Sequence, residues 1–153
     1  MQRKASDNKY LHRDFHITLN ILLEYIDKQL GRGAVIQYLS QYTRAYHQPL
    51  HEELKAGNLK ALSDYLIQIY QKEEWPVRIN AGEDFIEIQQ DACPGIAHIK
   101  ASGNPVYPYY VETYRTVYET LCEDTPFQYY LHNFDSETGA CAQVFTKKEE
   151  GKR

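Results

Sequence analysis

Several features of other protein classes are missing from this sequence of 153 residues. No stretch approaches the ~20 consecutive apolar residues of a membrane-spanning helix, and the N-terminal segment lacks the apolar core of a secretory signal. Positive charge is not in excess, because 17 Lys and Arg face 21 Asp and Glu, for a net charge of −4. We therefore expect a cytoplasmic protein with neither nucleic acid nor a membrane as its partner.

Cysteine pairs and nucleotide-binding motifs are missing as well. Cys93, Cys122 and Cys141 form no C-x-x-C pair, and their separations fit no zinc-knuckle spacing, so we expect reduced thiols. The chain has no Walker A loop, no G-x-G-x-x-G and no G-x-S-x-G. We expect no cofactor and no metal, although a fold that gathered the three thiols would leave metal binding open.

Tyrosine, in contrast, is abundant, with 14 residues against 5 phenylalanines, 1 tryptophan and 1 methionine. Many of the tyrosines concentrate in two segments that are predicted to be largely helical. One interpretation is a pocket wall that offers hydroxyl groups to a polar ligand, and the other is ordinary core packing. The first would make Tyr42, Tyr114 and Tyr118 substrate-binding residues, with the guanidinium of Arg115 as an anchor for a carboxylate.

Helical periodicity dominates the first half of the chain. Apolar residues recur every three or four positions over 15–30, 35–46 and 59–69, which predicts three amphipathic helices. Asp14 is the expected N-cap of the first helix. Pro49 is expected to kink or restart the second helix, because proline cannot donate a backbone hydrogen bond.

The second half alternates with the period of β-strands. Segments 77–80 and 85–89 form one predicted hairpin, segments 127–134 and 141–147 form another, and a helix lies between them. The order ααα-ββ-α-ββ predicts an α+β fold, with N-terminal helices packed on a four-stranded, mainly antiparallel sheet.

The length is that of one ordinary domain. We therefore expect a single domain over 1–153, with a helical half at about 10–74 and a ββαββ half at about 76–147. The charged tail at 148–153 is expected to fray, since it has no apolar residues to bury.

Cys93 is the strongest candidate for chemistry. It ends a predicted strand and precedes Pro94, a residue favoured at the first position of a helix, so that Cys93 would cap that helix. Free backbone N–H groups there would lower the pKa of the thiol and make it a nucleophile. His98 and His16 are the candidate catalytic acid–base partners. The alternative is a small buried cysteine without a chemical role.

Two histidine pairs have a spacing that raises the question of metal binding. His12 and His16 would share a helical face, a geometry that suits one metal ion, unless Asp14 caps the helix and leaves His12 outside it. His47 and His51 are also four residues apart, but the proline between them argues against a continuous helical face. Solvated or structural histidines are the favoured interpretation of both pairs.

The second half resembles a known family, the L-2-amino-thiazoline-4-carboxylic acid hydrolase-like proteins. The likeness rests on a Cys-Pro pair at a strand end, a cysteine at a helix end and a terminal Gly…Cys…Phe strand, here Cys93-Pro94, Cys122 and Gly139–Phe145. It spans about residues 10–147, and the start at Asp14-Phe15-His16 is compatible with it. The resemblance implies hydrolysis of a cyclic amidine-like C=N bond, which opens a thiazoline carboxylate to an N-carbamoyl-cysteine.

Two functions follow as expectations. The first is a small-molecule hydrolase in which Cys93 attacks the C=N carbon, His98 or His16 moves protons, and Arg115 or a tyrosine holds the carboxylate. The second is a non-catalytic binding or sensor domain with a tyrosine-lined pocket, more loosely similar to vinyl-reductase-like small-molecule-binding domains. Both have a small molecule as partner, and both are compatible with a homodimer.

Overall fold

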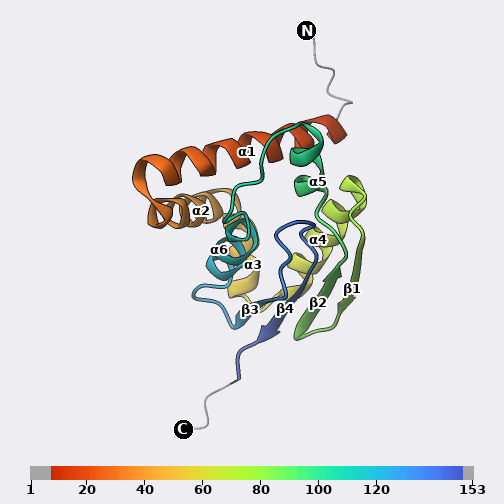
Figure 1. Cartoon of the computed structure of the whole chain (residues 1–153). Coiled ribbons are helices and arrows are strands. Elements are labelled where there is room, and N and C mark those ends of the chain that lie inside the picture. Colours follow the sequence, from red (N-terminus) through yellow and green to blue (C-terminus); the bar gives the residue numbers. More distant parts are fainter. Residues whose placement is uncertain (1–7, 150–153) are drawn as a thin grey trace.

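The computed structural model describes residues 8–149, with side chains from Phe15 onward, and confirms an α+β fold of six helices and four strands in that range. The elements are α1 (Asn8–Leu30), α2 (Arg32–Tyr46), α3 (Gln48–Lys55), α4 (Leu59–Glu73), β1 (Val77–Ala81), β2 (Phe85–Gln90), α5 (Pro94–Ala101), α6 (Glu112–Leu121), β3 (Phe127–His132) and β4 (Cys141–Lys147). In Figure 1 the sheet lies at the bottom, and α1 crosses the molecule on the far side from it.

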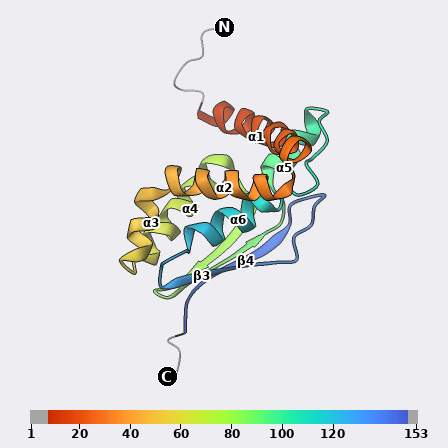
Figure 2. The same ribbon diagram turned by 90° about the vertical axis from the view of Figure 1, so that its left-hand side faces the viewer.

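The four strands form one antiparallel sheet in the order β1-β2-β4-β3. Side chains alternate between its two faces, so that in β2 Ile86, Ile88 and Gln90 are buried while the residues between them are exposed. Figure 2 shows the helices on one face of the sheet and none over the other. The buried side chains therefore point at the helices.

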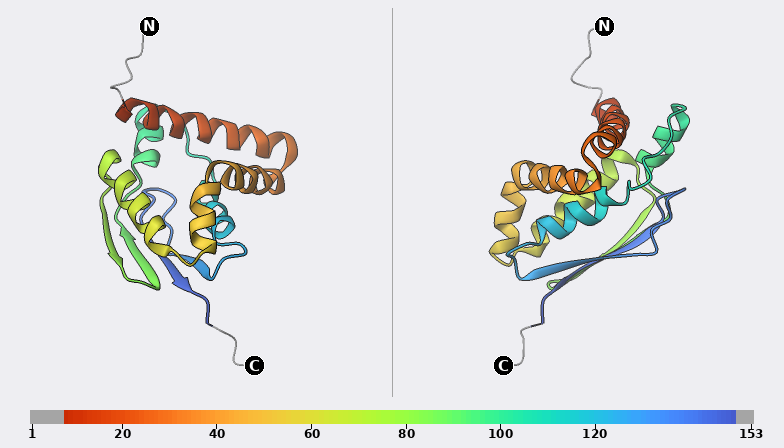
Figure 3. Two further views of the ribbon diagram at one scale, coloured as in Figure 1. Left: turned by 180° about the vertical axis from the view of Figure 1, so that it is seen from behind. Right: turned by 60° about the vertical axis from the view of Figure 1, so that its left-hand side comes forward.

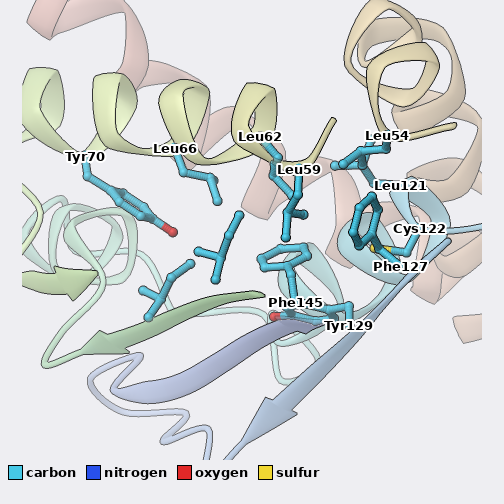
Figure 4. Close-up of a cluster of buried hydrophobic side chains, with 12 residues drawn as sticks. Leu54, Leu59, Leu62, Leu66, Tyr70, Leu121, Cys122, Phe127, Tyr129 and Phe145 are labelled. Atoms are coloured by element: carbon cyan, nitrogen blue, oxygen red, sulfur yellow. The ribbon is translucent and has the colours of Figure 1, made fainter. Parts of the chain in front are cut away.

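The largest core cluster lies between α4 and the sheet. Leu59, Leu62 and Leu66 recur at helical spacing on α4 and are at most 1% exposed. They point at the sheet, where fully buried Phe145 of β4 meets them (Figure 4). Burying each leucine contributes roughly 2 kcal/mol, so this contact fixes α4 on the sheet.

Two smaller core clusters hold the remaining helices. One joins α1, α2 and α6 through residues such as Leu23 and Val117, and the other joins α5 to α6 through Ile96 and Tyr114. The left view of Figure 3 shows α5 beside the first half of α1, and the two helices are in contact. Tyr118 packs against all three clusters.

Helix boundaries differ from the predictions most at the start of α1, while α2 begins earlier, at Arg32, and α4 ends later, at Glu73. α1 begins at Asn8, so Asp14 lies inside the helix and is not its N-cap. The helix extends because no glycine or proline interrupts residues 8–13. Gly31, with φ of +85°, separates α1 from α2. Pro49 lies in the first turn of the separate helix α3, which confirms the predicted restart.

Both ends of the chain are only partly described. Residues 1–7, where the sequence predicts no secretory signal, lie outside the described range. So does most of the tail that is predicted to fray, at residues 150–153. Lys148 is described and anchored, since its backbone N–H donates to the carbonyl of Pro126 at 2.7 Å. Among the described helices, none has the length and apolar character needed to cross a membrane.

Candidate functional site

A cavity of about 600 Å³ lies where the three core clusters meet. This volume lies within the usual range for small-molecule sites. Its lining residues are Phe15, His16, Leu19, Leu39, Tyr42, Tyr46, His47, Tyr65, Gln68, Ile69, Lys72, Glu73, Trp75, Cys93, Tyr110, Thr113, Tyr114, Val117 and Tyr118. The fold thus brings five of the predicted site residues, Cys93, His16, Tyr42, Tyr114 and Tyr118, to one cavity.

His16 and Glu73 form a polar corner of the cavity. Nε2 of His16 lies 3.5 Å from Oε2 of Glu73, and the side chains are 17% and 12% exposed. Nδ1 of His16 lies 3.3 Å from the hydroxyl of Tyr110, while the indole N–H of Trp75 donates to Oε2 of Glu73 at 2.6 Å. A Cβ at Gly95 would stand 2.7 Å from Nδ1 of His16, so glycine lets α5 pack this closely on α1.

Asn20 on α1 holds the segment that precedes α6. Its side chain is 1% exposed. The amide donates to the carbonyl of Pro105 at 2.9 Å, and the amide oxygen accepts from the backbone N–H of Tyr107 at 2.8 Å. The hydroxyl of Tyr107 also donates to Asp27 of α1 at 3.0 Å. These contacts set the position of Tyr110 on the cavity wall.

Cys93 is the N-cap residue of α5 and is 1% exposed. The hydroxyl of Tyr114 and the backbone N–H groups of Gly95 and Ile96 act to lower the pKa of the thiol, but burial outweighs them and raises it. The expected low pKa is therefore wrong, because removing a thiolate from water costs more than these donors contribute.

Tyr114 and Tyr118 lie one turn apart on α6 and line the cavity together. The hydroxyl of Tyr114 accepts a hydrogen bond of 3.1 Å from the fully buried amide of Gln90, which also donates to the carbonyl of Gly139 at 2.5 Å. Burial raises the pKa of both tyrosines well above its usual value. This wall therefore presents neutral hydroxyl groups at physiological pH.

Five aromatic rings, which we term the aromatic collar, follow one another along the cavity wall. They are Phe15 of α1, Tyr42 and Tyr46 of α2, His47, and Tyr65 of α4, with successive ring centroids 5.0–6.5 Å apart. Phe15 is 45% and Tyr46 64% exposed, so these two rings stand at the mouth. Burial raises the pKa of Tyr42 to about 12 and lowers that of His47, which keeps both rings uncharged.

His98 and Arg115 were expected at the same site as Cys93, but they do not line this cavity. His98 lies on α5 five residues after Cys93, which turns it about 140° around the helix axis. Arg115 lines a second cavity, and its guanidinium lies 3.3 Å from the buried carboxylate of Glu112, which Arg32 also contacts. The structure thus brings neither residue together with Cys93.

Sequence reasoning does not single out Glu73, Trp75 or Tyr65. Glu73 belongs to the charged run at 72–74, which is typical of a solvated helix end, and the packing of α4 on the sheet turns it inward. Trp75 supplies the one available signal, because it is the only tryptophan and a buried indole N–H needs an acceptor nearby.

The three cysteines are all buried and free. Burial raises the pKa of Cys122 and Cys141 to about 12. Within the described part of the chain, no three His, Cys, Asp or Glu side chains come close enough together to hold a metal ion. The side chain of His12, one member of a predicted histidine pair, lies outside the described residues.

No protein-family model, curated protein or solved structure matches this chain. The resemblance to the thiazoline hydrolase-like proteins therefore stays a prediction. A functional argument must rest on the chemistry of the cavity, since fold alone does not determine function.

Proposed function

We propose that this chain is a small-molecule-binding domain and that its ligand occupies the cavity between α1, α2, α4 and α6. The observation that carries the proposal is the cavity wall, in which six tyrosines surround a space of about 600 Å³. These rings contact one another along the wall and still leave a space large enough for a ligand.

The chemistry of the wall favours a mainly apolar ligand with a few polar groups. Tyrosine rings offer flat apolar surface, and the hydroxyls of Tyr110 and Tyr114 can donate or accept hydrogen bonds. Both hydroxyls stay protonated, because burial raises their pKa. The His16–Glu73 corner supplies the polar end of the cavity.

Ile69→Trp is expected to block ligand binding by filling the cavity. Ile69 lines the cavity from α4 and is half-buried, so a larger ring can enter the empty space with little disturbance of the core. We expect the affinity for N-phenyl-1-naphthylamine, an uncharged fluorescent probe, to fall roughly tenfold or more. Fluorescence titration at a fixed protein concentration measures the change.

Ile67→Trp is the matched control. Ile67 is also half-buried on α4 but does not line the cavity, so this variant should bind the probe like the original chain. Binding that is lost equally in both variants would place the probe elsewhere. A chain that does not bind the probe at all would contradict the proposal.

A second candidate function is hydrolysis of a cyclic amidine-like C=N bond such as that of a thiazoline carboxylate. It is favoured by the presence of Cys93, His16 and Tyr114 on one cavity. Because the resting thiol is neutral, Cys93 would have to lose its proton when substrate binds, with His16 as the base. Turnover that Cys93→Ser abolishes would support hydrolysis, and turnover that this variant retains would exclude Cys93 as the nucleophile.

The pH dependence of Cys93 alkylation distinguishes a resting thiol from an activated one. Burial raises the pKa of Cys93, so the rate of reaction with iodoacetamide should reach half its maximum above pH ~8.5, which is the midpoint for an unperturbed thiol. Mass spectrometry of the Cys93 peptide gives the rate, with the unfolded chain as reference. A midpoint at or below pH ~7 would reveal an activated thiolate and favour hydrolysis.

A further inference from the structure

Two rings of the aromatic collar, Phe15 and Tyr46, are exposed to solvent, whereas rings that serve only core packing are buried. Single exposed aromatic residues are common on protein surfaces, but these rings continue without a break from the mouth into the cavity. Tyr46 is 64% exposed, yet it stacks on Tyr42 at 5.4 Å between centroids with the planes inclined by 12°. His47 stands edge-on to both tyrosines. Continuous exposed apolar surface of this kind marks binding sites.

The collar also carries no charge where its rings meet. Burial disfavours ionisation of Tyr42, Tyr65 and His47. The charged lining groups, Lys72 and Glu73, are seven and eight residues beyond Tyr65 on α4, or roughly 11 Å along the helix. His16 stands beside Glu73 at that same end. The wall around Tyr46 and His47 is therefore suited to contact an uncharged part of a ligand.

We infer that the ligand presents a planar, uncharged aromatic group to the collar, where it stacks on Tyr46, the exposed ring of the Tyr42–Tyr46 pair, and contacts His47. This inference rests on the proposed binding function and narrows its ligand class. Stacked and edge-on ring contacts favour a π-system over a saturated group of equal size. The hydroxyl-bearing wall formed by Tyr114 and Tyr118 would then face any polar substituent that reaches further in.

A pair of matched compounds tests the inference. 2-Naphthol and decahydro-2-naphthol share one skeleton and one hydroxyl group, but only the first is planar and aromatic. Each is titrated against the chain loaded with N-phenyl-1-naphthylamine, and displacement gives its affinity. We expect 2-naphthol to bind roughly tenfold more tightly than the saturated compound.

Tyr46→Leu should remove most of this preference, because it takes away an exposed π face while keeping apolar bulk. Tyr25→Leu is the control, since Tyr25 is 62% exposed on α1 and does not line the cavity. It should retain the tenfold ratio.

Each outcome bears on one of the two proposals. Equal affinity of the two compounds, failure of both to displace the probe, or a ratio that Tyr46→Leu leaves unchanged would overturn the inference and leave the binding function standing. Failure of the probe itself to bind would overturn the binding function, and the inference with it.

Discussion

Gly139→Ala is expected to lower the free energy of unfolding by about 2–5 kcal/mol. Gly139 has φ of +76°, and an added Cβ would stand 2.3 Å from Cβ of Cys93 and 3.2 Å from its backbone nitrogen. That nitrogen donates to the carbonyl of Thr138 at 2.8 Å, and the carbonyl of Gly139 accepts from Gln90. Because both sides of the contact are held, backbone strain and overpacking add together.

Gly103→Ala separates the two contributions. Gly103 has nearly the same φ, +78°, but an added Cβ would meet nothing within 4 Å. Only the left-handed backbone is then unfavourable, at about 1–2 kcal/mol. Urea unfolding of the two variants gives the difference. Equal losses would mean that the approach of Gly139 to Cys93 is not a tight contact.

Phe145→Ala is expected to cost about 3–5 kcal/mol of unfolding free energy. Phe145 is fully buried on the helix-facing side of β4, and its ring centroid lies 4.8 Å from that of Tyr129 and 5.2 Å from that of Tyr118. Removal leaves a cavity beneath α4 and takes away one support of Tyr118. We therefore also expect weaker binding of N-phenyl-1-naphthylamine in the folded variant.

Phe85→Ala provides the comparison for this substitution. Phe85 lies on the neighbouring strand β2, but it is 37% exposed on the face without helices. Loss of its ring should cost clearly less than loss of Phe145, about 1 kcal/mol. Thermal unfolding of both variants measures the contrast. Similar losses would show that the two faces of the sheet contribute equally to the core.

The fold class could be predicted because local patterns agree with tertiary packing. Alternation in 85–89 places Ile86 and Ile88 on one face, and the structure covers that face with α4. The leucines of α4 follow helical spacing for the same reason. The start of α1 could not be predicted, because Asp14 has the chemistry of a cap whether or not the preceding residues continue the helix.

The candidate site could be predicted in part, for a different reason. Tyr42, Tyr114 and Cys93 share one cavity although they lie far apart in the sequence, and only their residue types suggested a common site. The presence of Glu73 in the site could not be predicted from the sequence, since its burial depends on contacts with Trp75 and His16. The raised pKa of Cys93 was also beyond reach, because the depth of a side chain is set by packing and not by its position before a helix.

Asn20 makes two hydrogen bonds to backbone groups of Pro105 and Tyr107. These bonds join α1 to the segment that precedes α6. Asn20 therefore supports the contact between His16 and Tyr110, in which Nδ1 of His16 lies 3.3 Å from the Tyr110 hydroxyl. Glu73 belongs to α4, which is fastened to the sheet instead. We therefore expect ligand binding to change the gap between α1 and α4 more than the contact between His16 and Tyr110, and a spectroscopic distance between labels on α1 and α4 measures that change.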